Sequence, residues 1–233
     1  MMFYICFSAI HAKITKIYNF ATGMRNVLYI HGMGGGSDSR IPSILRDALS
    51  CYGVSVHVRT YDFDPESASI QIGSWVTELK PDLVIGESLG SLHAIRITGI
   101  PHLFVSPALN APLYFGVMAW LSLIPGVTRL FDRIYKPREG DRQHLHFTFQ
   151  TLRKYRRHRK TAFAHSTRNG GGDYFFAFIG TRDHYRKTGV VSLRTWKKHF
   201  GDTFHTYEGT HFMEEEFIHS MLVAKVLEVL SIK

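Results

Sequence analysis

The chain has 233 residues, of which 45% are hydrophobic and 20% are charged, the composition of an ordinary globular protein. This length is enough for a complete hydrophobic core, and every apolar run is shorter than the roughly 20 residues that a membrane-spanning helix needs. The two cysteines, Cys6 and Cys51, exclude a disulfide framework and predict a reducing, cytoplasmic location.

The net charge of +9 is concentrated in one segment. Residues 129–160 hold eleven Lys and Arg against three acids, a local balance of +8, so the rest of the chain is close to neutral. A segment of this kind suits either an anionic partner or a helix face that is simply solvated.

Residues 1–23 form an N-terminal extension whose structure the sequence does not define. Residues 1–10 are apolar, but no basic region precedes them and no small-x-small cleavage site follows, which disfavours a signal peptide. Met24 stands directly before the first clear strand pattern, so both Met1 and Met24 are candidates for the start of the protein.

Beyond residue 24, predicted strands and helices alternate along the chain. The patterns predict strands over 26–30, 54–60, 83–85, 102–105, 174–179 and 203–207. They also predict a first helix that ends at about residue 51, and further helices over 66–79, 89–98, 190–200 and 214–230. This alternation is typical of a mostly parallel α/β sheet with helices on both faces. The alternation fails from 108 to 172. We therefore expect one core made of residues 24–107 and 173–233, interrupted by an insertion over 108–172.

The strand over 83–85 runs into Gly86-Glu87-Ser88-Leu89-Gly90, which fits the pattern G-x-S-x-G. A turn this sharp between strand and helix strains the serine backbone and leaves room only for glycine two residues on either side. Ser88 is predicted to stand at the end of a central strand, where the following helix points its N–H groups. Taken alone, the pattern is more often an ordinary turn.

Two further residues complete the set that a nucleophilic serine needs, namely a base that takes its proton and a carboxylate that orients the base. Asp183 follows the strand over 174–179, and His211 follows the strand over 203–207. Both therefore lie beyond the carboxyl ends of strands, as Ser88 does, and the order Ser, Asp, His is that of α/β-hydrolases. We expect Ser88 to be the nucleophile, Asp183 the acid and His211 the base.

A serine hydrolase also needs an oxyanion hole with backbone N–H donors. Leu89, directly after the nucleophile, supplies the first. The loop after the first strand supplies the second, which we assign to Met33, with Gly34 as the alternative. The residues expected to support these two loops are His31, Gly32, Gly34, Gly86 and Gly90.

The same glycines do not have the spacing of a dinucleotide-binding or phosphate-binding loop. The chain also contains no H-E-x-x-H pattern, and its two cysteines are far apart. The sequence therefore predicts neither a cofactor nor a metal ion.

These motifs resemble those of the α/β-hydrolase superfamily and, within it, of the small YqiA-like esterases. The resemblance covers residues 24–107 and 173–230 and rests on Leu28-Tyr29-Ile30-His31-Gly32, Gly86-Glu87-Ser88-Leu89-Gly90, Ser106-Pro107-Ala108, Gly180-Thr181-Arg182-Asp183-His184-Tyr185-Arg186 and Glu208-Gly209-Thr210-His211. It implies the α/β-hydrolase fold and the triad Ser88, Asp183 and His211. The chain departs from that group at Ser106, where asparagine is common, and in its long insertion. By analogy, such an insertion forms a cap over the active site.

The sequence thus predicts a serine hydrolase that cleaves small or lipid-like carboxylic esters through an acyl-enzyme intermediate. A thioesterase, lipase or acyltransferase would use the same residues. The competing interpretation is a non-catalytic protein of the same fold that binds an anionic partner, nucleic acid or a lipid surface, through residues 129–160. For this segment an anionic substrate, an anionic membrane surface and a solvated helix face all stay open, and nucleic acid is the partner that we expect least. Residues 113–123 are interpreted as an apolar lid or as core of the insertion.

Overall fold

The structure is a computed structural model that describes residues 23–136, 139–168 and 174–232. Nearly all of the N-terminal extension, and the glycines 170–172 at the end of the predicted insertion, lie outside the described residues.

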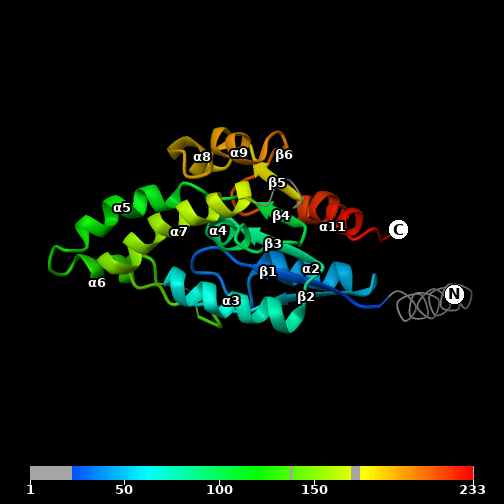
Figure 1. The fold of residues 1–233 in the computed structure, drawn as a ribbon, viewed down its shortest axis with the longest axis horizontal. Helices are drawn as coiled ribbons and strands as arrows, with labels where there is room; N and C mark the ends of the chain where they lie inside the picture. Colours follow the sequence, from blue (N-terminus) through cyan, green and yellow to red (C-terminus); the bar gives the residue numbers. More distant parts are fainter. Residues whose placement is uncertain (1–22, 137–138, 169–173, 233) are drawn as a thin grey trace, which may run out of the picture.

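The strands form one sheet in the order β2-β1-β3-β4-β5-β6, parallel at every pairing (Figure 1). Along the chain they are β1 (Arg25–Ile30), β2 (Val54–Val58), β3 (Leu83–Glu87), β4 (His102–Val105), β5 (Phe175–Gly180) and β6 (Phe204–Tyr207). All six predicted strands are present, with ends displaced by two residues at most. The predicted parallel sheet is confirmed, because runs of apolar residues this short become strands when both of their faces are buried.

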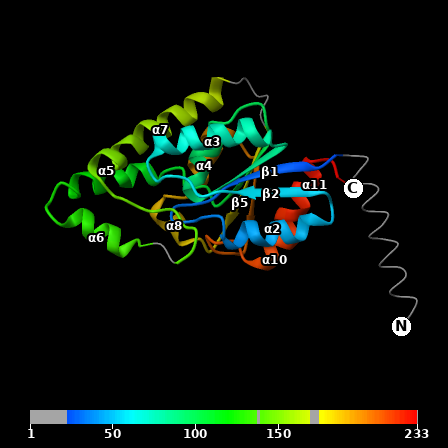
Figure 2. The same cartoon turned by 90° about the horizontal axis from the view of Figure 1, so that it is seen from below.

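Side chains alternate across a strand, so the central strands contribute to two separate cores. Leu28 and Ile30 of β1 pack in one core, while Val27 and Tyr29 pack in the other. The first core is covered by α3 (Pro65–Leu79), α4 (Ser91–Ala94), α7 (Phe149–Arg168) and α9 (Leu193–Phe200). The second is covered by α2 (Arg40–Ser50) and by the C-terminal helices (Figure 2). The prediction of helices on both faces is confirmed.

Three predicted helices differ in the structure from their patterns. The helix expected over 89–98 is one 3₁₀ turn, Ser88–Gly90, followed by α4 alone, because the chain turns at Gly99 (φ +76°) to reach β4. The helix expected over 190–200 begins three residues later, as α9, and an unpredicted short helix, α8 (His184–Thr188), precedes it and ends at Gly189 (φ +78°). The last helix consists of α10 (Glu215–Phe217), a π-helical segment (Ile218–Val223) and α11 (Ala224–Val229).

The segment predicted as an insertion supplies α5 (Ala111–Leu121), α6 (Val127–Ile134) and α7. α5 and α7 lie side by side and, with α6, form the end of the molecule opposite the C-terminus (Figure 1). Phe115 of α5 and Tyr155 of α7 meet edge to face in their shared core, with ring centroids 5.1 Å apart. In the described part of the chain, we find no helix with the length and apolar character needed to cross a membrane.

Candidate active site

Ser88 follows β3 at the carboxyl edge of the sheet, in the strained turn that the sequence predicts. Its φ of +48° lies in the left-handed region, which non-glycine residues seldom adopt. A Cβ at Gly86 would lie 2.8 Å from the Cβ of Ala94, and one at Gly90 would lie 2.3 Å from the carbonyl oxygen of His31. The two glycines are thus required by close packing of the turn against the chain before and after it.

Ser88, His211 and Asp183 form one continuous hydrogen-bonded chain. The Ser88 Oγ lies 2.9 Å from His211 Nε2, and His211 Nδ1 lies 2.8 Å from Asp183 Oδ2. Because a carboxylate only accepts, the consistent assignment has Nδ1–H donating to Asp183 and Nε2 accepting the Ser88 hydroxyl proton. His211 and Asp183 are buried, whereas Ser88 is partly exposed. The three residues lie far apart in the sequence and come together only at this edge of the sheet.

The orientation of Asp183 is fixed by a second role, as the N-cap of α8. Its Oδ1 accepts the backbone N–H of Tyr185 at 2.8 Å, which leaves Oδ2 directed at His211. The ring of Tyr185 then lies edge-on to the His211 imidazole, with centroids 4.6 Å apart. The carboxylate and the imidazole are therefore held in place before any substrate binds.

The loop after β1 approaches the serine closely. A Cβ at Gly32 would lie 3.0 Å from the Cβ of Ser88, so a side chain there would crowd the nucleophile. The N–H groups of three successive glycines in this loop are occupied by protein acceptors, namely Gln143 Oε1 for Gly34, the Gly32 carbonyl for Gly35 and Ser39 Oγ for Gly36.

The N–H of Met33 has no acceptor among the described residues. The engagement of the Gly34 N–H by Gln143 removes it as a competing donor. Met33 therefore stays the predicted second oxyanion donor in preference to Gly34, with Leu89 as the predicted first.

His31 lies beneath this loop and is neutral. It is fully buried, and its Nδ1 is 2.8 Å from the Gly32 carbonyl oxygen, to which it donates. Its ring stacks on Tyr61, whose hydroxyl donates to the His31 carbonyl at 2.6 Å. Burial lowers the pKa of His31 to about 4, so at neutral pH the imidazole supports the loop and carries no charge.

Sequence reasoning did not identify Gln143, which lies in the strap, as we call residues 139–147 between α6 and α7. Gln143 is almost fully buried and makes three hydrogen bonds: its Oε1 accepts from Gly34, its Nε2 donates to the Asp62 carbonyl at 3.3 Å, and its N–H donates to the Gly35 carbonyl at 2.7 Å. No motif surrounds it, and it lies 109 residues from its partner Gly34. Only its burial and its bonds reveal its role.

The described residues contain no group of three His, Cys, Asp or Glu side chains that could hold a metal ion.

Comparisons with known proteins give the fold. No protein-family pattern matches the chain, and no curated protein matches its sequence. Among solved structures, the chain is similar to Est1E from Butyrivibrio proteoclasticus with bound ferulic acid, with a TM-score of 0.63 and 16% identity over 89% of this chain and 90% of that one. It is also similar to tomato methylketone synthase I, with a TM-score of 0.57 and 11% identity over 90% and 98% of the two chains.

A third similar structure is mouse alpha/beta hydrolase domain-containing protein 10, with a TM-score of 0.55 and 12% identity over 88% of this chain and 89% of that one. These identities are low, so the likeness concerns the fold, and the resemblance to YqiA-like esterases stays a prediction. Together with the parallel sheet and the turn that carries Ser88, the three likenesses establish that this chain has the α/β-hydrolase fold.

Proposed function

We propose that the protein is a serine hydrolase that cleaves carboxylic esters through an acyl-enzyme intermediate. The observation that carries the proposal is the chain of hydrogen bonds from Ser88 to His211 to Asp183, at 2.9 and 2.8 Å. A serine hydroxyl in this setting has both a base for its proton and a carboxylate that stabilises the resulting imidazolium.

The reaction follows from these positions. His211 Nε2 takes the Ser88 proton as Oγ attacks the ester carbonyl carbon, and the N–H groups of Leu89 and Met33 bind the developing oxyanion. The tetrahedral intermediate collapses, and the leaving alkoxide receives the proton from His211. A water molecule then gives its proton to His211 and attacks the acyl group. Collapse of the second intermediate releases the carboxylic acid and returns the proton to Ser88.

The comparisons support this proposal only indirectly, because one fold hosts many chemistries. Est1E is described with ferulic acid bound, and a carboxylic acid is the class of product that ester cleavage releases. The fold itself does not distinguish an esterase from a thioesterase, lipase or acyltransferase.

We further propose that the insertion acts as a cap that shapes the acyl site. The strap is hydrogen-bonded to the loop after β1, and Leu145 lies 3.6 Å from where a Cβ of Gly34 would stand. The strap therefore lies against the loop that approaches Ser88. Small or lipid-like esters are the substrates we expect.

The surroundings of Ser88 do not support the competing interpretation, a non-catalytic protein of the same fold. A protein without chemistry needs neither a partly exposed serine nor a strained φ at that residue. The cations of α7 can serve a partner in addition to catalysis.

The test is hydrolysis of p-nitrophenyl esters of increasing chain length, together with labelling by a fluorophosphonate that reacts with activated serines. In Ser88→Ala, kcat should fall by about 10⁴-fold or more, and the label should be lost. Ser74→Ala, at an exposed serine on α3, is the matched control and should keep both. A folded wild-type protein that hydrolyses no ester and takes no label at Ser88 would refute the proposal.

A further inference from the structure

A groove of about 740 Å³ runs between α5 and α7, and it contains none of the triad residues. One wall is apolar and comes from α5, with Leu113, Gly116, Val117 and Trp120. The other wall is cationic and comes from α7, with Arg153, Arg156, Arg157 and Lys160. The groove therefore combines an apolar surface and a cationic surface.

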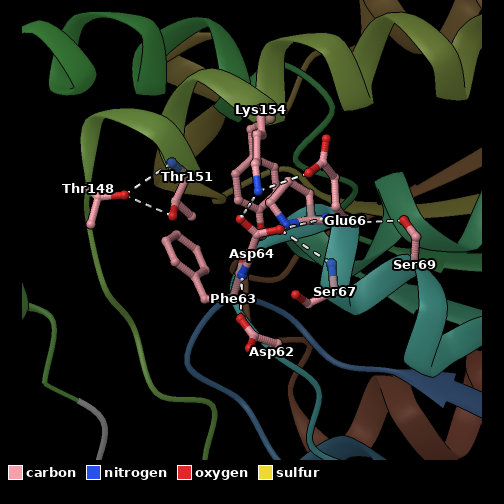
Figure 3. A network of polar contacts seen from close by, with 11 residues as sticks. Asp62, Phe63, Asp64, Glu66, Ser67, Ser69, Thr148, Thr151 and Lys154 are labelled. Carbon is pink, nitrogen blue, oxygen red and sulfur yellow. Dashed lines mark hydrogen bonds and ion pairs between the residues drawn. The ribbon is translucent and has the colours of Figure 1, made fainter.

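The four cations of the groove differ from Lys154 and Arg159 of α7, whose charged groups bind other parts of the described chain. Lys154 forms ion pairs with Asp64 and Glu66 at 2.7 and 2.9 Å (Figure 3). Arg159 donates to the Leu109 carbonyl and to Asn110 Oδ1, both at 2.7 Å. By contrast, the groove cations are all exposed, and none has an ion-pair partner among the described residues.

The four like charges repel one another, and α7 contains no acidic residue that would offset this repulsion. Only Arg153 has a described contact of another kind, with its guanidinium over the Phe149 ring at 5.3 Å. Apart from that contact, the described residues give this cluster no stabilising partner, whereas an anionic partner would give one.

The apolar wall lies in the part of the described chain where exposed large hydrophobic residues are most concentrated. Ten of the sixteen exposed large hydrophobic residues lie between positions 113 and 135, on α5, on α6 and in the turn that joins them. α5 carries no charged residue, and its inner face is already occupied by Phe115 and Ala119 in the core. A helix that is apolar on all sides normally has both of its faces covered. The outer face of α5, with Val117 and Trp120 each 64% exposed, has no such cover from the residues that the structure describes.

We propose that the α5–α7 face docks on an anionic lipid bilayer. Leu113, Val117 and Trp120 would enter the interfacial layer, where indole rings are favoured, while the cations of α7 contact the anionic headgroups. The long stems of Arg and Lys allow the charges to reach the phosphates while their methylenes cover apolar surface. This proposal does not depend on ester hydrolysis, and it is tested without measuring activity.

A bilayer matches both walls of the groove, and the alternatives match only one. A nucleic acid would neutralise the cations but would leave Leu113 and Val117 exposed to water. A second copy of the chain could cover the apolar wall, but a symmetric contact would bring the two cationic walls together at high electrostatic cost. Charge and apolar character together therefore favour a lipid surface.

The test measures cosedimentation of the full chain with vesicles. One set is phosphatidylcholine alone, and the other is phosphatidylcholine and phosphatidylglycerol in equal parts. Binding should require the anionic lipid and should weaken as salt is raised. Each cation near such a surface changes affinity by about fivefold, so Arg153→Glu/Arg156→Glu/Arg157→Glu should lose at least about a hundredfold. Val117→Ser/Trp120→Ser should lose at least about tenfold with the charge unchanged.

The matched control is Arg46→Glu/Lys80→Glu/Arg194→Glu, which makes the same change in net charge at exposed positions on α2, after α3 and on α9. It should lose much less affinity than the groove variant. Equal losses in the two triple variants would mean that net charge alone drives binding and would refute the proposal. The proposal would also be refuted if the wild-type protein bound neither type of vesicle, or if it bound a single-stranded oligonucleotide but not the anionic vesicles. Circular dichroism of each variant excludes loss of folding as the cause.

Discussion

Gly90 illustrates how little freedom single residues have around the candidate nucleophile. Its Cα passes so close to the end of β1 that an added Cβ would lie 2.3 Å from the His31 carbonyl oxygen and 2.5 Å from that of Ile30. Both obstacles are backbone atoms, which cannot rotate away as a side chain can. Relief would require β1 and the turn after β3 to separate, and that turn and the loop after β1 contain Ser88 and the predicted oxyanion donors.

We therefore predict that Gly90→Ala lowers the free energy of unfolding by at least about 2 kcal/mol and removes esterase activity. Gly73→Ala on α3 is the control, because a Cβ there meets nothing within 4 Å. That substitution should stabilise the protein by up to about 1 kcal/mol, as alanine favours a helix interior. Urea unfolding of the two variants tests the contrast, and a Gly90→Ala protein as stable as the wild type would contradict it.

At this scale the sequence predicts a residue when a motif and a strand end coincide. Ser88, Asp183 and His211 could be found because each follows a recognisable strand, and parallel strands bring such positions to one edge. Gln143 could not be found, because a single glutamine in an irregular segment has no pattern. Its importance comes from Gly34 and Asp62, which the fold alone brings beside it.

At the scale of elements, the strap holds the loop that carries Met33. Gln143 links this strap to the loop through bonds from both its side chain and its backbone, and Arg142 adds an ion pair with Asp38 at 2.8 Å. The loop has no regular secondary structure of its own to fix the direction of the Met33 N–H. Its position therefore depends on a segment that belongs to the insertion.

Gln143→Ala should consequently lower kcat for ester hydrolysis by about tenfold or more while changing KM by less than about twofold. The reason is that a displaced Met33 N–H weakens binding of the transition state more than binding of the substrate. Glu139→Ala, an exposed position in the same strap, should leave both constants unchanged. Wild-type values of kcat and KM in Gln143→Ala, or a change in KM alone, would contradict the role of Gln143 in positioning the Met33 N–H.

The predicted elements were most accurate where local pattern and tertiary contacts agree. The strands satisfy both, so their ends are nearly correct. The helix after Ser88 is shorter than its pattern, because the chain turns at Gly99 to reach β4. Arg96, just beyond α4, donates to Thr161 Oγ1 of α7 at 2.6 Å, and this partner is 65 residues away. Tertiary contacts of this kind override helix propensity, and no local window of sequence contains them.

At the scale of the whole molecule, a row of buried histidines connects the active-site loop with α7. His31 stacks on Tyr61, the Tyr61 ring lies 5.1 Å from that of His93, and the His93 ring lies 4.5 Å from that of His158. Burial lowers the pKa of His31 to about 4, that of His158 to about 3, and that of His93 well below its ordinary value. All three are therefore neutral in the folded protein at pH 7.

Stability should consequently fall as the pH drops below about 6.5, the ordinary histidine pKa. In that range the unfolded chain binds protons that the folded chain excludes, and each histidine contributes about 1.4 kcal/mol per pH unit until its folded-state pKa is reached. Carboxylates titrate lower and do not account for the decline between pH 6.5 and 5. Urea unfolding at pH 7 and pH 5 measures the effect, and His93→Phe should reduce its slope. A wild-type stability that is flat over this interval would contradict the prediction.

The strand order also determines when the candidate site can exist during synthesis. Ser88 is made early, but His211 follows β6, the last strand of the sheet, and β6 joins only at the edge formed by β5. β5 in turn pairs with β4 across the whole length of the insertion, a connection that is slow to close. A nascent chain would therefore carry its nucleophile without a base beside it until the residue 123 positions later has been added. Reactivity would begin only when the final strand docks, so hydrolysis would report the completion of folding.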